Sequence, residues 1–79
     1  MLKVVKADYL SNYVLVLTFN DGAVKAFDFS VVYNEGICTK LKDLDYFKKF
    51  KLDPFSVDWN DEIGFAPEYL YEYGTPVLV

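Results

Sequence analysis

The sequence predicts a small α+β fold, in which an antiparallel sheet of four to five strands begins as a β-meander and is covered by two short helices. Three observations support this class. Apolar runs flank an Asn-Asp-Gly turn in the first third of the chain, residues 43–50 show helical spacing of apolar side chains, and residues 67–73 lie between Pro and Gly. With 79 residues, 53% of them hydrophobic, we expect residues 1–79 to form a single domain that buries about 60–65% of its unfolded surface.

The first 29 residues predict the meander. Residues 13–19 are rich in β-branched and aromatic side chains, which favour strands. Residues 20–22 follow as a turn, and Asp-Gly between two apolar runs is a strong hairpin signal because both residues tolerate positive φ. Residues 23–29 form the return strand, and residues 3–10 form a strand that precedes a turn at 11–12. Because the strand at 13–19 is apolar on both faces, we expect it to be central and covered on both sides.

The hairpin has two alternative registers. A two-residue loop of Asp21 and Gly22 places Val16 opposite Phe27. A three-residue loop with Gly22 in a bulge places Leu15 opposite Phe27 instead. The alternatives send different side chains to the core, since a slip of one residue exchanges the faces of a strand.

Residues 43–50 are the best helix candidate. Asp43 can cap the start of this helix, and Asp45 suits the first turn, where acidic side chains complement the helix dipole. Three-residue spacing places apolar side chains on one face: Leu44, Phe47 and Phe50. We interpret the cations at the end of the segment as a solvated helix terminus: Lys48, Lys49 and Lys51.

The segments on either side of this helix carry weaker signals. Ser30 can cap a short helical turn, and Gly36 suits a left-handed residue at its end. Residues 37–41 are expected to be extended or irregular. After a turn at 53–54, residues 55–59 alternate as a half-buried strand does, with one set of side chains on the buried face: Phe55, Val57 and Trp59.

The C-terminal part of the chain predicts a closing helix. A polar loop is expected at 60–64. Residues 67–73 form the helix, with Pro67 in its first turn and Gly74 as its stop. The apolar tail at 75–79 is expected to be disordered or to dock as an edge strand.

Composition excludes several classes of function. The net charge is −4, and the chain has neither Arg nor His. Without Arg, and with an acidic balance, direct nucleic-acid binding is disfavoured. Without His, catalytic triads and His-ligated zinc sites are excluded.

The compartment is predicted from the single cysteine and from the shortness of the apolar runs. Cys38 has no second cysteine to pair with, which fits a reducing compartment. The start of the chain lacks the layout of a signal peptide, and the longest apolar run, residues 13–17, is too short to span a bilayer. We therefore expect a cytoplasmic protein with no membrane partner.

The sequence predicts no catalytic, cofactor or metal site. The densest carboxylate group lies near the C-terminus: Asp58, Asp61, Glu62 and Glu68. Its spacing matches no EF-hand loop, so we interpret it as a solvated acidic loop. Cys38 has no His partner, and Lys25 is predicted to be an outward residue of the return strand.

Several motifs together resemble domain-of-unknown-function family 2442, an uncharacterised bacterial family. They run along nearly the whole chain: Phe19-Asn20-Asp21-Gly22, Leu41-Lys42-Asp43 with Phe47, and Trp59 followed by Pro67-Glu68-x-Leu70-Tyr71. The chain departs from the family pattern at Gly64, where an Asp is common. If that Asp has a shared polar role, this chain lacks it or uses Asp61 or Glu62 instead.

The resemblance implies a small α+β domain with an antiparallel sheet and no established activity. Many members are encoded beside a second small family, number 4160, in a layout like that of a toxin–antitoxin pair. Some relatives carry a helix-turn-helix domain after this module. The resemblance thus supports a binding role.

Our leading hypothesis is a non-enzymatic interaction module that binds another small protein, in the manner of an antitoxin facing a small toxin, or a second copy of itself. The candidate anchors for a partner are Trp59, Tyr69, Tyr71 and Tyr73. In the alternative interpretation, Trp59, Leu70 and Tyr71 lock the closing helix onto the sheet, and for Trp59 and Leu70 we favour this interpretation. The alternative functions are an accessory module of a DNA-associated transcriptional regulator and a metal-dependent hydrolase.

Overall fold

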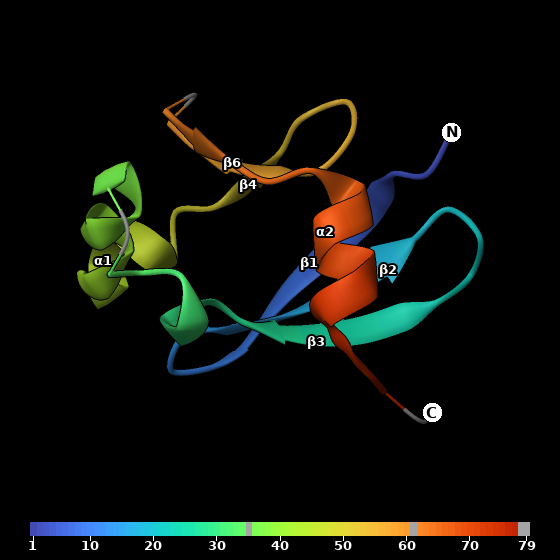
Figure 1. Cartoon of the computed structure of the whole chain (residues 1–79), viewed down its shortest axis with the longest axis horizontal. Coiled ribbons are helices and arrows are strands. Elements are labelled where there is room, and N and C mark those ends of the chain that lie inside the picture. The colour runs from blue at the N-terminus through green and yellow to red at the C-terminus, as the bar shows by residue number, and fades with distance from the viewer. Residues whose placement is uncertain (35, 61, 78–79) are drawn as a thin grey trace.

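The computed structural model describes residues 1–34, 36–60 and 62–77 and has the predicted α+β fold (Figure 1). Its strands are β1 (Val4–Ser11), β2 (Val14–Phe19), β3 (Val24–Asp28), β4 (Lys51–Leu52), β5 (Val57–Trp59), β6 (Ile63–Gly64) and β7 (Thr75–Pro76). Its α-helices are α1 (Leu44–Phe47) and α2 (Pro67–Tyr73), and its 3-10 helices are η1 (Phe29–Val31) and η2 (Gly36–Lys42).

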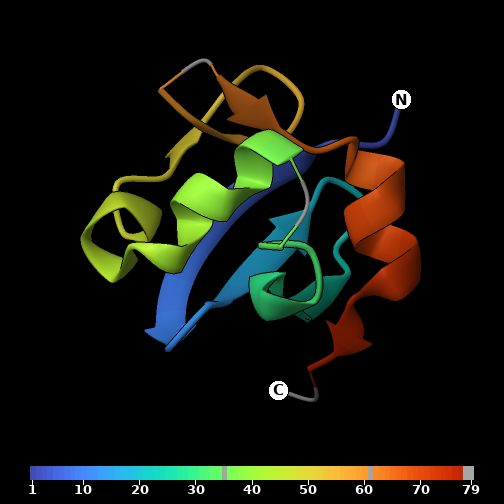
Figure 2. The same cartoon turned by 60° about the vertical axis from the view of Figure 1, so that its left-hand side comes forward.

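The strands form two antiparallel sheets. The predicted meander is the main part of a four-stranded sheet with the order β1-β2-β3-β7, and a three-stranded sheet with the order β4-β5-β6 adds to it. Figures 1 and 2 show the second sheet, α1 and α2 on the same side of the meander. The core therefore lies between the meander and these elements.

The hairpin adopts the register with the three-residue loop. Leu15 is opposite Phe27, and the backbone N–H of Phe19 donates to the carbonyl oxygen of Ala23 at 2.8 Å. Gly22 has a φ of 94°, which an L-residue adopts only with strain. This turn sets which face of the hairpin reaches the core.

The central strand β2 is fully buried on one face only. The side chains buried on the inner face are Leu15, Leu17 and Phe19. The other face is half-buried, with Val14, Val16 and Thr18. The expectation that both faces of this strand are covered is therefore wrong, because the covering elements lie on one side of the meander.

The strand β5 is more buried than its alternation predicts. Val57 and Trp59 are buried as expected, but Ser56 and Asp58 on the opposite face are buried as well. The strand β5 is the central strand of its sheet, and Asp58 is opposite Lys51 of β4 on one side and Gly64 of β6 on the other. Phe55, predicted on the buried face, precedes the strand and is exposed. The predicted polar loop at 60–64 instead contains β6.

The middle segment differs from prediction in its helices. Asp43 caps α1 as expected, with its carboxylate accepting from the N–H of Asp45. However, α1 ends at Phe47, because the chain soon enters β4. Residues 37–41 lie in the 3-10 helix η2 rather than in an extended segment. The cap of η1 is Asp28 rather than Ser30.

Aromatic rings fill the core. The rings of Phe47 and Trp59 stack, with centroids 5.6 Å apart and planes 27° apart. Phe29 packs on both, at 5.6 Å from Phe47 and 5.3 Å from Trp59. These three rings come from α1, β5 and η1, and η1 directly follows the meander, so the cluster joins the two sheets.

The closing helix α2 has its predicted bounds. Pro67 occupies the first turn. Gly74 ends the helix in an extended rather than a left-handed conformation. Glycine suits this position because a Cβ there would lie 2.7 Å from the carbonyl oxygen of Leu70. The tail docks as an edge, with Thr75 and Pro76 pairing with β3, while Leu78 and Val79 lie outside the described residues.

Replacing Gly22 by Ala tests the turn. We expect Gly22→Ala to lower the free energy of unfolding by about 1–2 kcal/mol, since the positive φ strains an L-residue. For a chain of this size each kcal/mol lowers Tm by about 4–8 °C. The control is Gly64→Ala, whose added Cβ meets neighbours only at 3.9 Å. Equal Tm values for the two variants, measured by circular dichroism, would contradict the turn assignment.

Candidate partner-binding surface

The helix α2 divides the predicted anchor residues between two faces. Leu70 is fully buried and Tyr71 half-buried, so both face the sheet. Tyr69 and Tyr73 are exposed. Residues four apart lie on the same side of a helix, so the exposed face combines two columns: Glu68 with Glu72, and Tyr69 with Tyr73. We call these four residues the Glu–Tyr face.

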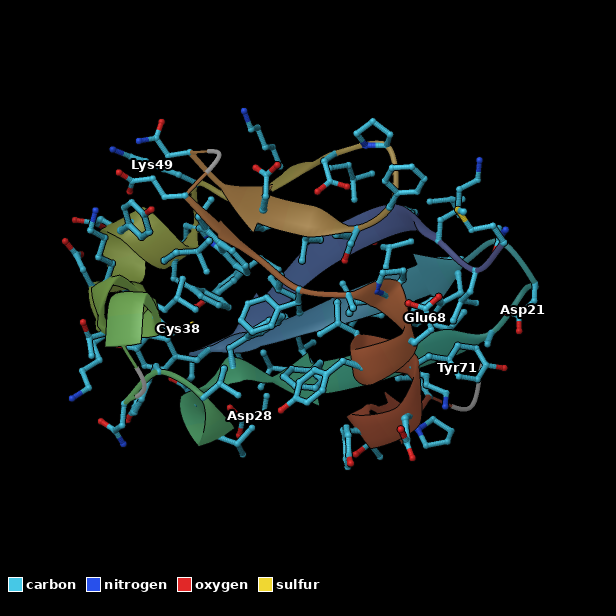
Figure 3. All side chains as sticks on the ribbon, turned by 45° about the horizontal axis from the view of Figure 1, so that its top comes forward. Asp21, Asp28, Cys38, Lys49, Glu68 and Tyr71 are labelled. Carbon is cyan, nitrogen blue, oxygen red and sulfur yellow. The ribbon has the colours of Figure 1, made fainter. Side chains whose placement is uncertain are left out.

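Tyr71 holds α2 against the hairpin. Its ring lies 5.0 Å from that of Phe19 in an edge-to-face arrangement, and its hydroxyl donates to Asp21 Oδ2 at 2.8 Å. Figure 3 shows Tyr71 and Asp21 on the same side of the molecule, where α2 meets the hairpin turn. Tyr71 therefore has the locking role that we gave as the alternative to a partner anchor.

Lys25 of β3 also holds α2 against the hairpin, through its contacts with Tyr71. Its Nζ donates to the carbonyl oxygen of Tyr71 and lies 4.0 Å from the centroid of the Tyr71 ring. A cation there complements the negative C-terminal end of α2. The prediction that Lys25 points outward is wrong. The register places it opposite Leu17, and this pair lies on the covered face.

The contact between α2 and the turn shifts two pKa values. A hydrogen bond from the backbone N–H of Ala23, with a second from the Tyr71 hydroxyl, holds the pKa of Asp21 below its ordinary value of 3.8. The hydrogen bond to Asp21 raises the pKa of Tyr71 above its ordinary value of 10.0. Both shifts favour the state in which Asp21 is charged and Tyr71 is neutral.

Trp59 lies in the core and not on the surface. Only 1% of the residue is exposed, and its Nε1–H donates to the carbonyl oxygen of Phe47 at 2.8 Å. A buried indole needs such a partner for its donor. Trp59 therefore matches the packing role that we favoured for it.

The tyrosines of the Glu–Tyr face are exposed to different degrees. Tyr73 is 64% exposed and Tyr69 37%, and their rings lie 5.0 Å apart. Tyr69 also packs on Phe27 and stacks on Phe65. These contacts hold Tyr69 in place, so the face presents one fixed and one more exposed ring.

The glutamates of this face have no partner among the described residues. Most other carboxylates accept a hydrogen bond or an ion pair: Asp8, Asp21, Asp28, Asp43, Asp53 and Glu62. Within residues 1–34, 36–60 and 62–77, no ion pair or side-chain hydrogen bond reaches Glu68 or Glu72. Both are exposed, so α2 presents two charges that are available to another molecule.

A hollow next to Tyr69 extends this surface. It has a volume of about 370 Å³ and is lined by Val32, Cys38, Gly64, Phe65, Ala66 and Tyr69. A second hollow of about 520 Å³ shares residues 64–66 with the first, and its lining also includes Phe55, Pro67 and Glu68.

The described members of the predicted carboxylate group lie in different surroundings, although Asp58 and Glu62 line one hollow. Asp58 is buried in β5, and its Oδ1 has no hydrogen-bond partner. Glu62 Oε2 lies 2.7 Å from Lys40 Nζ, and this hydrogen bond lowers the pKa of Glu62. Glu68 belongs to α2, and Asp61 lies outside the described residues. In the part of the chain that is described, no three His, Cys, Asp or Glu side chains are placed to hold a metal ion.

Two of the four residues of the Glu–Tyr face were predicted from residue type to be partner anchors, and both are exposed. Tyr69 and Tyr73 were predicted, whereas Glu68 was assigned to the acidic loop and Glu72 was missed. The spacing of Glu68 and Glu72 at i and i+4, parallel to that of the tyrosines, is the signal that identifies the face.

Comparison with known proteins gives a family but no activity. A family model described as "Protein of unknown function (DUF2442)" matches residues 4–76, which confirms the resemblance seen in the motifs. No curated protein and no solved structure matches the chain significantly. In residues 1–34, 36–60 and 62–77, no helix has the length and apolar character needed to cross a bilayer.

Truncation of Trp59 tests its core role. Trp→Ala in a core costs about 3–5 kcal/mol, and a chain of this size has about 4–12 kcal/mol in total. We expect Trp59→Ala to lose most of its cooperative urea transition, while Tyr73→Ala keeps the wild-type midpoint. A folded Trp59→Ala variant with an unchanged midpoint would contradict the packing role.

Replacing Asp21 by Asn tests the Tyr71 contact. Because its pKa is raised in the folded chain, Tyr71 contributes stability below its ordinary pKa of 10.0 that is lost as pH rises through the raised value. We expect Asp21→Asn to lower the pKa of Tyr71, measured by NMR from the chemical shift of a ring carbon. The variant should also lose less stability than the wild type as the pH rises through the Tyr71 pKa. Asp28→Asn, which removes a carboxylate from the far end of β3, is the control. An unchanged Tyr71 pKa in Asp21→Asn would show that the contact does not persist in solution.

Proposed function

We propose that this chain, which belongs to the DUF2442 family of proteins of unknown function, is a non-enzymatic interaction module that binds a second small protein through the Glu–Tyr face of α2. The observation that carries the proposal is the combination on one helix of two exposed tyrosines with two exposed glutamates that have no partner among the described residues.

The tyrosines suit this role because they combine a large apolar ring with a polar end. Such residues are enriched at protein interfaces and often carry much of the binding energy. Tyr69 is already held by Phe65 and Phe27, so little side-chain entropy is lost when a partner covers it. The hollow beside Tyr69 provides space for a side chain of the partner.

The glutamates suggest a basic partner. A Lys or Arg can form an ion pair with Glu68 or Glu72 and also lie over a tyrosine ring, where a cation is attracted to the π face. The net charge of −4 would also speed the approach of a basic protein. The same acidic face disfavours direct contact with nucleic acid, whose phosphates would be repelled.

The partner class follows from this chemistry and from the family. A small basic protein encoded beside this one, in the toxin–antitoxin-like layout that the family resemblance implies, would have the required size and charge. An antitoxin would then act by covering a functional surface of its toxin. This role needs binding energy but no catalytic group, which agrees with the sequence prediction of no enzymatic activity.

Affinity capture from native cells, read by mass spectrometry, tests the proposal. We expect the tagged chain to recover a small basic protein at equal stoichiometry. Tyr73→Ala and Glu72→Gln should each reduce that recovery severalfold without lowering Tm, because both residues are exposed. The controls are Leu52→Ala and Asp45→Asn, which remove an exposed apolar side chain and a helix carboxylate elsewhere on the surface.

Two outcomes would contradict the proposal. One is recovery of no stoichiometric partner at native expression. The other is a partner whose recovery falls equally in the control variants and in the α2 variants, since binding would then not depend on the Glu–Tyr face.

A further inference from the structure

The strand β1 forms an edge of the four-stranded sheet. It pairs with β2 on one side and stands at one end of the strand order β1-β2-β3-β7. At its start, the N–H of Val4 donates to the carbonyl oxygen of Phe55 at 2.8 Å. From residue 5 to residue 11, no described backbone group bonds outside the β1–β2 ladder. The strand β4 lies close to β1 but does not pair with it, so the outer backbone groups of residues 5–11 have no strand partner on that side among the described residues and can accept one.

The side chains of β1 are mostly exposed. All of residues 5–11 except Ala7 are exposed, including the apolar residues Val5, Tyr9 and Leu10. Leu10 alone is 59% exposed. A second strand laid along β1 would cover part of this apolar surface.

Opposite charges lie on either side of Ala7 in β1. Lys6 and Asp8 flank Ala7, and their charged groups lie 3.7 Å apart on the solvent face, with the side chains 67% and 60% exposed. When two copies of β1 run antiparallel with Ala7 opposite Ala7, Lys6 of each copy is opposite Asp8 of the other. The charge pattern is therefore self-complementary.

We propose that two copies of this chain pair through β1 in this register, as an antiparallel dimer with Ala7 on its two-fold axis. Pairing of this kind joins the two sheets edge to edge and brings Val5 of each copy near Tyr9 of the other. Backbone hydrogen bonds and the covered apolar side chains supply the attraction. The charges select the register.

The neighbouring symmetric registers are disfavoured by charge. When two edge strands are related by a two-fold axis, one residue lies opposite its own copy. The adjacent symmetric registers therefore centre on the residue before or after Ala7. A slip to the adjacent symmetric register places Lys6 opposite Lys6 or Asp8 opposite Asp8. Like charges directly opposite each other destabilise a strand pair, whereas opposite charges stabilise it by roughly 0.2–1 kcal/mol.

The contact between the two copies of β1 is short, so the dimer is weak. The pairing of β1 with β2 is irregular at two positions, between Val4 and Lys6 and between Tyr9 and Ser11. Regular pairing to a second copy is therefore limited to the residues between these irregularities. We expect a weak dimer that forms with rising concentration.

The dimer would leave the Glu–Tyr face uncovered. The helix α2 lies against Lys25 of β3, and β3 is separated from β1 by β2. Self-pairing and partner binding thus use different parts of the molecule. The dimer does not depend on the function proposed above, and either can fail without the other.

Charge exchange at β1, read by analytical ultracentrifugation from micromolar to millimolar concentration, tests the pairing. The wild-type chain should shift from monomer toward dimer. Lys6→Asp and Asp8→Lys should each weaken the dimer by about tenfold or more, since every opposed charge pair becomes repulsive. The double variant Lys6→Asp/Asp8→Lys restores the complementarity and should dimerise as the wild type does.

Mixing the two single variants tests the register directly. The Lys6→Asp variant has acidic residues at positions 6 and 8, and the Asp8→Lys variant has basic residues there. An equimolar mixture should therefore form a heterodimer, although neither variant dimerises alone. Lys49→Asp makes the same charge change away from β1 and should have no effect. A wild-type chain that stays monomeric at the highest concentration would overturn the proposal. Failure of both the double variant and the mixture to dimerise would also overturn it, because both retain the charge pairing.

Discussion

The aromatic stack around Trp59 is the contact on which the rest of the structure depends. The strand that carries Trp59 belongs to a sheet of very short strands, which has little stability of its own. The stack of Trp59 on Phe47 and Phe29, with the indole N–H bonded to the carbonyl oxygen of Phe47, fixes that sheet and α1 to the meander. The heavy use of aromatic residues thus compensates for short elements, since each ring buries a large area for one residue.

The closing helix is the second requirement, and it serves two purposes at once. Leu70 and Tyr71 attach α2 to the hairpin, with Lys25 beneath its C-terminal end. Tyr69 adds contacts to Phe27 and Phe65 while it stays partly exposed, and Tyr73 lies mainly at the surface.

Local signals in the sequence predicted the hairpin turn and α2 well. Asp21 with Gly22, and Pro67 with Gly74, act through the conformations of the residues themselves, so they need no knowledge of the remaining fold. The length of α1, the presence of β6 and the inward position of Lys25 depend on contacts between distant segments. The side of β3 that Lys25 occupies follows from a register that the sequence left open. The same limit applied to the surface. The sequence singled out Tyr69 and Tyr73 by residue type, whereas the lack of a partner for Glu72 among the described residues depends on the positions of the neighbouring cations.

The central claim is that one side of α2 holds the fold together while the other side is available to a partner. The most direct measurement is NMR mapping of the ¹⁵N-labelled chain, with side-chain aromatic signals, before and after addition of the captured partner. We expect the signals of Tyr69, Glu72 and Tyr73 to shift strongly while those of Trp59 and Leu70 stay near their original positions. Shifts confined to a surface away from α2, or a general rearrangement of the core signals, would contradict it.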